Sequence, residues 1–235
     1  MTSSEIIIKE FKEFNLEEGY LIDGFPSVGF SSAIATESMI NTSQFELGGI
    51  IDSKIFPPIS VIKEGKPNYP SRIFINEDLK VGVFSSYLNL DQTLHRQVSE
   101  SMLEWSKKHK IKLIVSSVAV KSEKENSQMM GVGSTESARK KIEEAGLKVL
   151  DHGTIPGMLL NEGSITNQDV IVIIFNTSGE GPDFKSSAEL CMAMSKLIPG
   201  ASCDIPSLQK EAEKAEATIK ETQEESTHLK DSMYR

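Results

Sequence analysis

Cysteine and long apolar runs are both scarce in this sequence. Only Cys191 and Cys203 occur, and their spacing is not that of a metal site, so we expect two buried free thiols. No apolar run approaches the roughly twenty residues that a membrane span needs. The N-terminus also lacks the basic region and long apolar region of a signal peptide. We therefore expect a cytoplasmic protein that has no membrane partner and holds no metal.

Positive charge is in deficit. Lys and Arg number 25 against 34 Asp and Glu, which gives a formal net charge of -9. Nucleic-acid binding depends on clustered Lys and Arg that release counterions, so we do not expect nucleic acid as a partner. Hydrophobic residues make up 38% of the chain, which is ordinary for a compact globular protein. The length then favours one large domain followed by a tail.

Histidines that could serve as a general base are few. His95 and His109 fall on one predicted helix and His228 in the tail, which leaves His152 as the histidine that could line a cleft. A solvated loop histidine is the simpler interpretation even there, because histidine is often only half-buried. No hydrolase triad, zinc cluster or pair of magnesium-binding carboxylates can be assembled. We therefore expect neither an enzyme nor a bound cofactor.

Two glycine-containing segments lie where a phosphate-binding loop would be expected. The segment from Gly24 to Gly29 follows a predicted strand, but it lacks the lysine of a P-loop and the middle glycine of a dinucleotide fingerprint. We predict that its glycines serve tight turning and close helix packing. The segment from Gly131 to Thr135 precedes a predicted helix, and we predict a capped, flexible loop there.

Short apolar runs alternate with helical patterns, which indicates an α/β architecture. Nearly continuous apolar runs at 112–116 and 170–175 indicate strands with helices on both faces, and hence three layers. Residues 45–84 favour an antiparallel or mixed part of the sheet. The strand candidates are Tyr20–Asp23, Phe45–Ile51, Ile59–Lys63, Ile73–Ile75, Lys80–Phe84, Lys112–Ser116 and Val170–Phe175. The predicted helices are Val28–Ile40, Asp91–His109, Thr135–Ala145 and Pro182–Leu197.

The composition changes abruptly after Pro206. Glu, Lys, Ala and Thr dominate from there onward, with no aromatic residue before Tyr234. We predict an α/β domain over residues 1–205 and a polar, partly helical tail over 206–235. A heptad-like seam runs along this tail, but few of its members are large, so a mobile tail and a stable helical bundle both remain open. The seam consists of Leu208, Ala212, Ala215, Ile219, Thr222, Ser226, Leu229 and Met233.

Several motifs, taken in their order, resemble the proteasome assembly chaperone family. The likeness covers Tyr20 to Leu197, and Ser27 departs from it where the family usually has glycine. The motifs are Leu-Ile-Asp-Gly-Phe-Pro-Ser-Val-Gly-Phe at 21–30, Phe-Pro-Pro at 56–58, Glu-Gly-Lys-Pro at 64–67, Gly-Thr-Ile-Pro-Gly at 153–157 and Gly-Pro-Asp at 181–183.

This resemblance implies a nucleoside-phosphorylase-like fold, in which helices flank a three-layer mixed sheet, used as an interaction scaffold. It also implies an archaeal-type homologue that self-associates, for which we favour a tetramer. The matched residues Gly24, Pro26, Gly29, Pro58 and Gly65 would then be structural rather than catalytic, and family membership alone does not establish proteasome binding.

The last three residues carry the most specific functional signal. Met233, Tyr234 and Arg235 fit the hydrophobic, tyrosine, any-residue pattern, called HbYX, by which proteasome activators dock. A terminal carboxylate can pair with a pocket lysine, and the tyrosine ring can fill an apolar slot. We expect these residues to bind the α-ring of the 20S proteasome without ATP, either to assist ring assembly or to open the gate. Several tails on one oligomer would add avidity.

Two other functions remain open at this point. An enzyme on the nucleoside-phosphorylase-like scaffold would have the two glycine turns and His152 lining a small-molecule site. A purely structural oligomer would be held together by its C-terminal helices, and deletion of residues 207–235 would then dissociate it.

Overall fold

The structure, a computed structural model, describes residues 6–26, 28–63, 65–88, 90, 92–121, 128–177, 179 and 181–210. The seam beyond Leu208 and the terminal Met233, Tyr234 and Arg235 therefore lie outside the described residues. The described chain ends in a helix over residues 205–210, in which Leu208 is buried. The domain boundary between 205 and 206 stays a prediction.

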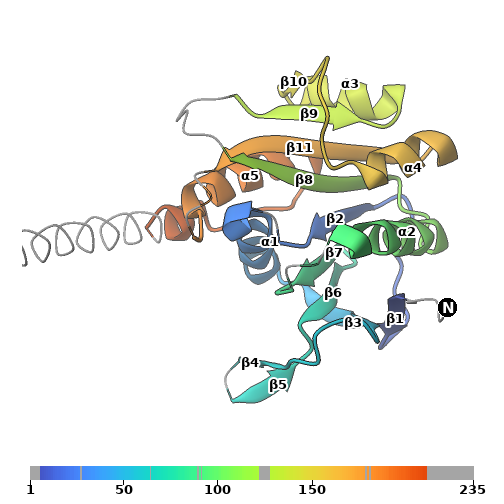
Figure 1. Cartoon of the computed structure of the whole chain (residues 1–235), viewed down its shortest axis with the longest axis vertical. Coiled ribbons are helices and arrows are strands. Elements are labelled where there is room, and N and C mark those ends of the chain that lie inside the picture. The colour runs from blue at the N-terminus through green and yellow to red at the C-terminus, as the bar shows by residue number, and fades with distance from the viewer. Residues whose placement is uncertain are drawn as a thin grey trace, which may run out of the picture.

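A nine-stranded mixed sheet forms the centre of the protein, in the order β1-β3-β6-β7-β2-β8-β11-β9-β10 (Figure 1). The strands β7, β2, β8 and β11 run parallel to one another, whereas antiparallel pairs flank them on both sides. A separate hairpin of β4 and β5 projects from the body. The strands are β1 (Ile6–Glu10), β2 (Tyr20–Gly24), β3 (Glu46–Ser53), β4 (Val61–Lys63), β5 (Lys66–Asn68), β6 (Ser71–Asn76), β7 (Val81–Ser86), β8 (Leu113–Lys121), β9 (Met130–Gly133), β10 (Lys148–Val149) and β11 (Asp169–Thr177).

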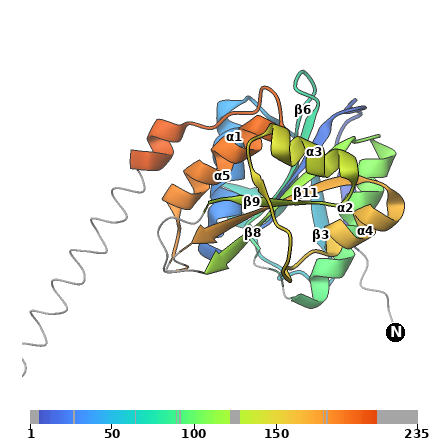
Figure 2. The same ribbon diagram turned by 90° about the horizontal axis from the view of Figure 1, so that it is seen from above.

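Helices cover both faces of this sheet, which makes three layers (Figure 2). The apolar side chains of α1, α3 and α5 pack into one core cluster, and those of α2 and α4 pack into a second cluster on the opposite face. None of the described helices combines the length and the apolar character needed to cross a lipid bilayer. The helices are α1 (Ser31–Thr42), α2 (Gln92–Lys108), α3 (Glu136–Glu144), α4 (Met158–Thr166) and α5 (Phe184–Leu197), with a 3-10 turn, η1 (Val28–Phe30), before α1.

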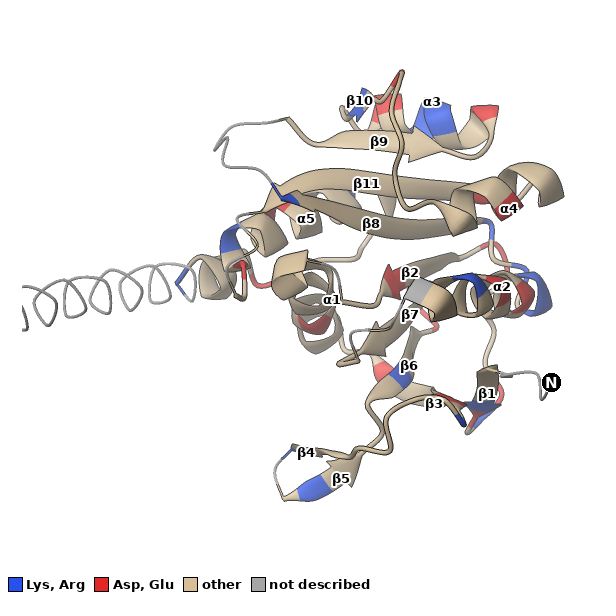
Figure 3. Ribbon diagram, viewed as in Figure 1, with Lys and Arg blue, Asp and Glu red and all other residues tan. Residues whose placement is uncertain are grey.

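Successive side chains of the central strands point to opposite faces, and both faces are buried. In β2, Ile22 joins the cluster under α1 while Leu21 joins the cluster under α2. In β8, Val115 and Ile114 divide in the same way. This double burial explains the nearly continuous apolar runs in the sequence. Charged side chains gather instead on the helices, the loops and the outer strands (Figure 3).

The predicted α/β architecture with three layers is confirmed, and every predicted strand and helix is present within a few residues of its expected bounds. The antiparallel part predicted for residues 45–84 is also confirmed. The short strands β1, β5, β9 and β10 were not predicted, and neither was α4. The apolar residues of α4 do not share one face, because Leu159 and Leu160 are buried while Ile165 is 79% exposed.

The prediction of a flexible loop from Gly131 to Thr135 was wrong. This segment begins with β9, which pairs with β11. Its glycines allow α3 to lie against the strand: a Cβ on Gly131 would come within 2.8 Å of Ile142, and one on Gly133 within 2.7 Å of the backbone nitrogen of Arg139. Thr135 does cap α3 with its hydroxyl, as predicted.

Two of the family-like motifs frame the projecting hairpin. Phe56 is buried at its base, and the neighbouring Pro58 is exposed. Gly65 turns the hairpin at φ 74°, a backbone conformation that favours glycine. Glu64 beside it, like Ser27 of the first motif, lies outside the described residues. Gly65 therefore suits the turn of this hairpin, and the structural role predicted for Pro58 stays a prediction.

Cys191 and Cys203 form a disulfide, so the prediction of two free thiols was wrong. Cys191 is fully buried on α5, and Cys203 lies in the segment that follows this helix, with the two Cα atoms 6.3 Å apart. The chain turns back after α5 through Gly200, whose φ is 83°. This turn, which the spacing of the cysteines does not reveal, brings the two residues together.

We expect a thiol-reactive dye to label no thiol of the unfolded protein before reduction and two thiols after it. Cys203→Ser should lower the free energy of unfolding by about 2–4 kcal/mol, the usual contribution of a disulfide. Urea unfolding with and without reductant measures this effect. Reductant should destabilise the wild type but not Cys203→Ser, and two reactive thiols before reduction would contradict the pairing.

Candidate functional site

The central strands β2 and β8 separate at their carboxyl ends. They are paired from Tyr20 to Ile22 of β2, and beyond that point β2 continues only beside β7. The chain leaves β2 through α1 toward β3, whereas it leaves β8 toward β9 on the other side of the sheet. Connections that part in this way create a crevice outside the carboxyl ends of the strands, which is where α/β proteins bind ligands.

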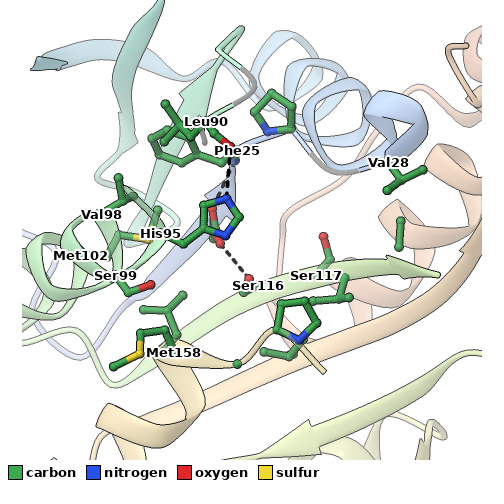
Figure 4. A pocket seen from close by; sticks show the side chains of 18 of the residues that line it. Phe25, Val28, Leu90, His95, Val98, Ser99, Met102, Ser116, Ser117 and Met158 are labelled. Atoms are coloured by element: carbon green, nitrogen blue, oxygen red, sulfur yellow. Dashed lines mark hydrogen bonds between the residues drawn. The ribbon is translucent and has the colours of Figure 1, made fainter. Parts of the chain in front are cut away.

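A cavity of about 1260 Å³ occupies this crevice (Figure 4). Its walls come from the loop after β2, from η1, from α2, from β8 and from the start of α4. Most of the lining is apolar and includes Phe25, Met102 and Leu159. The polar lining includes Asp23, His95, Arg96, Ser99, Ser116 and Ser117. A mostly apolar cavity with a few convergent polar groups is typical of a small-molecule site.

Asp23 is the acidic group of this cavity. Its Oδ1 accepts the backbone N–H of Phe25 at 3.2 Å, and its Oδ2 accepts the Ser116 hydroxyl at 2.7 Å. Burial raises the pKa of Asp23 above its ordinary value, and the two hydrogen bonds and the nearby His95 offset this only in part. The His95 ring has its Nε2 3.3 Å from the carbonyl oxygen of Leu90. Within the described residues, Asp23 forms no salt bridge.

Helix α2 supplies the other polar groups of the wall. The Arg96 side chain is 63% exposed and its guanidinium lies 3.9 Å from the Glu100 carboxylate, so its charge is largely solvated and partly paired. Ser99 is only 8% exposed, yet its hydroxyl has no hydrogen-bond partner in the described part of the chain. Figure 4 shows His95 and Ser99 on one side of the cavity, with Ser116 on the strand across from them.

Gly24 and Gly29 of the first motif flank the loop after β2, which forms part of the cavity wall. A Cβ on Gly24 would lie 2.6 Å from Oγ1 of Thr36 on α1, and a Cβ on Gly29 would lie 2.6 Å from Oγ1 of Thr177. Gly29 also has φ 72°, which interrupts the helical backbone, so α1 begins later than predicted. Pro26 lies between them and lines the cavity. These close approaches and the positive φ of Gly29 support the predicted role of the glycines in turning and close packing.

His152, the histidine expected to be able to line a cleft, is exposed and lies outside the cavity. His95 on α2 contributes a ring to the cavity instead. Asp23 and Ser116 were missed as a pair, although each ends a predicted strand. Polar residues at the carboxyl ends of adjacent apolar strands are the signal that could have found them.

We expect Asp23→Asn to stabilise the ligand-free protein at neutral pH. The amide oxygen can accept the N–H of Phe25 and the amide nitrogen can donate to the Ser116 oxygen, and the amide carries no charge to bury. Burial raises the pKa of Asp23 in the folded state. The contribution of the neutral Asp23 to the free energy of unfolding is therefore fully present below the unfolded-state pKa, and it is lost as the pH rises through the folded-state pKa. The gain in melting temperature of the variant should therefore grow with pH from the acidic range upward. Circular dichroism melts at several pH values measure it, and a variant less stable than the wild type throughout would contradict the assignment.

The fold and the cavity define a class: a three-layer α/β protein with a ligand-type crevice at the carboxyl edge of its parallel strands. A family model described as the PAC2 family matches residues 21–223, and the chain belongs to this family. None of the curated proteins matches the chain in sequence.

Solved structures share the fold over nearly the whole chain. Pyrococcus furiosus PbaA, described as an archaeal homolog of proteasome-assembly chaperone, is 26% identical, with a TM-score of 0.83 and coverage of 97% of this chain and 96% of that one. Pyrococcus furiosus PbaB, described as an archaeal proteasome activator, is 16% identical, with a TM-score of 0.78 and coverage of 94% and 99%. A Thermoplasma acidophilum protein of unknown function is 19% identical, with a TM-score of 0.72 and coverage of 94% and 92%. The last two show the fold alone.

Proposed function

We propose that this protein binds the α-ring of the 20S proteasome through Met233, Tyr234 and Arg235, without ATP and without catalysing a reaction of its own. The observation that carries the proposal is the HbYX pattern at the C-terminal end of a PAC2-family sequence. Docked tails can assist assembly of the ring or open the gate of the finished particle, and the proposal covers both roles.

The relatives support a role connected with the proteasome. PbaA, which matches this chain almost end to end, is described as a homolog of a proteasome-assembly chaperone. PbaB has the same fold and is described as a proteasome activator. Both descriptions agree with a proteasome-docking tail on this α/β domain.

The tail is long enough to bind a partner pocket at a distance from the α/β domain. The sequence runs to 235 and the described chain ends at 210, which leaves 25 residues. These would span roughly 38 Å as a helix, at about 1.5 Å per residue, and up to about 80 Å when extended. In either form the terminal carboxylate can enter a pocket on a partner while the α/β domain stays outside it.

We also propose that the chain forms a homo-oligomer, with a tetramer as the expected state. Apolar side chains on and beside the projecting hairpin support self-association: Ile55, Ile59 and Ile62 are 44%, 53% and 66% exposed. Exposed apolar side chains that form a contiguous patch mark interaction surfaces. Ile62→Lys should shift the mass measured by light scattering toward the monomer, and an unchanged mass would place the interface elsewhere.

A pull-down with purified 20S proteasome tests the docking proposal. The full chain should retain the particle, whereas a chain that ends at Ser232 should not. Circular dichroism and light scattering should be the same for both chains, because the three removed residues lie beyond the α/β domain. Equal retention by the two chains would refute docking by the C-terminus.

A further inference from the structure

We propose that the cavity at the carboxyl ends of β2 and β8 binds a small primary amine with an apolar body, whose ammonium group is held by Asp23 and Ser99. This inference is independent of the proposed proteasome binding, since none of the cavity residues lies in the tail. Three features of the cavity carry it: the charge of Asp23, the free hydroxyl of Ser99 and the apolar walls.

The first feature is a carboxylate that forms no salt bridge in the described part of the chain, although the exposed His95 ring lies near it. Asp23 has two hydrogen bonds, and both donors are neutral groups, the backbone N–H of Phe25 and the Ser116 hydroxyl. A buried charge is normally paired, because removing it from water without compensation is costly. A carboxylate offers about four lone-pair positions, so acceptor capacity remains on the cavity side. An ammonium group supplies both the missing charge and the missing donors.

The second feature is the unpartnered hydroxyl of Ser99. Serine within a helix usually faces solvent or bonds a carbonyl of the preceding turn. Ser99 bonds no such carbonyl among the described residues; the residue is only 8% exposed and lines the cavity. The Ser116 oxygen, which donates its proton to Asp23, keeps lone pairs free. Asp23 and Ser116, which are hydrogen-bonded to each other, and Ser99 on α2 offer one carboxylate and two hydroxyl groups as acceptors, and a primary ammonium has three N–H donors.

The third feature is the apolar surround, which selects the rest of the ligand. Phe25 comes from the loop after β2, Met102 from α2 and Leu159 from α4, and they give the cavity apolar surface on several sides. The exposed Arg96 lies beside Glu100, and His95 is the other basic residue of the lining. The body of the ligand should therefore be aryl or alkyl, and a fully polar polyamine should bind less well.

Other ligand classes fit the same groups less well. An anion would meet the Asp23 carboxylate with the wrong sign. Among the described residues no group of three or more His, Cys, Asp and Glu side chains is arranged to hold a metal ion. A neutral alcohol would use the hydroxyls but leave the charge of Asp23 uncompensated. The net charge of -9 also favours the approach of cations over anions.

Isothermal titration calorimetry of the full-length protein with 2-phenylethylamine and 2-phenylethanol tests the proposal, because the two probes share a shape and differ in charge. We expect the amine to bind the wild type at least tenfold more tightly than the alcohol. Asp23→Asn should weaken amine binding at least tenfold, and Ser99→Ala should weaken it severalfold. Asp151→Asn, which removes an exposed carboxylate outside the cavity, is the matched control and should bind as the wild type does.

The expected stability of Asp23→Asn protects the test from misfolding, since this variant should melt no lower than the wild type at neutral pH. Equal affinity for amine and alcohol would overturn the proposal. So would amine binding that survives Asp23→Asn, or that is lost in Asp151→Asn instead. Hexylamine and tryptamine serve as further probes, and the absence of binding by all three amines at millimolar concentration would also overturn it.

Discussion

Replacing Tyr234 by Ala is expected to abolish measurable binding to immobilised 20S proteasome while leaving the fold and the oligomer unchanged. Tyr234 is the second-last residue of a polar tail, far along the chain from the α/β domain. Burial of a large side chain in a partner pocket contributes about 1.5–3 kcal/mol, which is roughly ten- to hundredfold in affinity for one tail. The loss multiplies when several tails of one oligomer engage the same ring.

Two further variants separate the aromatic anchor from the charged one. Tyr234→Phe keeps the ring and should have a milder effect than Tyr234→Ala. Addition of one residue after Arg235 keeps every side chain but moves the terminal carboxylate away from its pocket lysine, so it should also prevent binding. Surface plasmon resonance, with peptidase activity recorded alongside, measures both effects. Undiminished binding by Tyr234→Ala and by the extended chain would mean that the HbYX match is accidental and that the partner contacts the α/β domain.

Gly29→Ala is expected to lower the free energy of unfolding by about 2–5 kcal/mol. Two costs add up at this position. Its φ of 72° lies in the left-handed region, where a residue with a Cβ loses about 1–2 kcal/mol. The new Cβ would also lie 2.6 Å from Oγ1 of Thr177, and overpacking of this kind costs about 1–3 kcal/mol. Thr177 cannot move away freely, because its hydroxyl donates to Asp183 at 2.7 Å.

Gly65→Ala is the matched control for this prediction. Gly65 has nearly the same backbone conformation, with φ 74°, but nothing lies within 4 Å of the position of its Cβ. It should therefore show only the conformational cost of about 1–2 kcal/mol. Urea unfolding of both variants measures the difference. Adding Thr177→Ala to Gly29→Ala should restore part of the lost stability, and equal destabilisation by Gly29→Ala and Gly65→Ala would show that the contact with Thr177 is unimportant.

The main strands and helices could be predicted because their signals are local. Strands buried on both faces must be apolar at successive positions, and β8 and β11 are apolar in this way. The elements that were missed lack such a signal. β9 alternates glycine with larger residues, β5 contains Pro67 within three residues, and α4 carries the exposed Ile165 on a helix without one apolar face.

The sequence by itself determined the α/β class, the order of the central elements, the family-like motifs and the Met233-Tyr234-Arg235 terminus, because each depends on neighbouring residues alone. Only the tertiary structure decided the disulfide, the packing role of Gly131 and the cavity. Asp23 and Ser116 are 93 positions apart in the sequence, yet they form a hydrogen bond. They do so because β2 and β8 are adjacent parallel strands that diverge at one edge. Strand order and register are set by pairing between distant segments, and no periodicity within a single segment records which distant residue will lie opposite it.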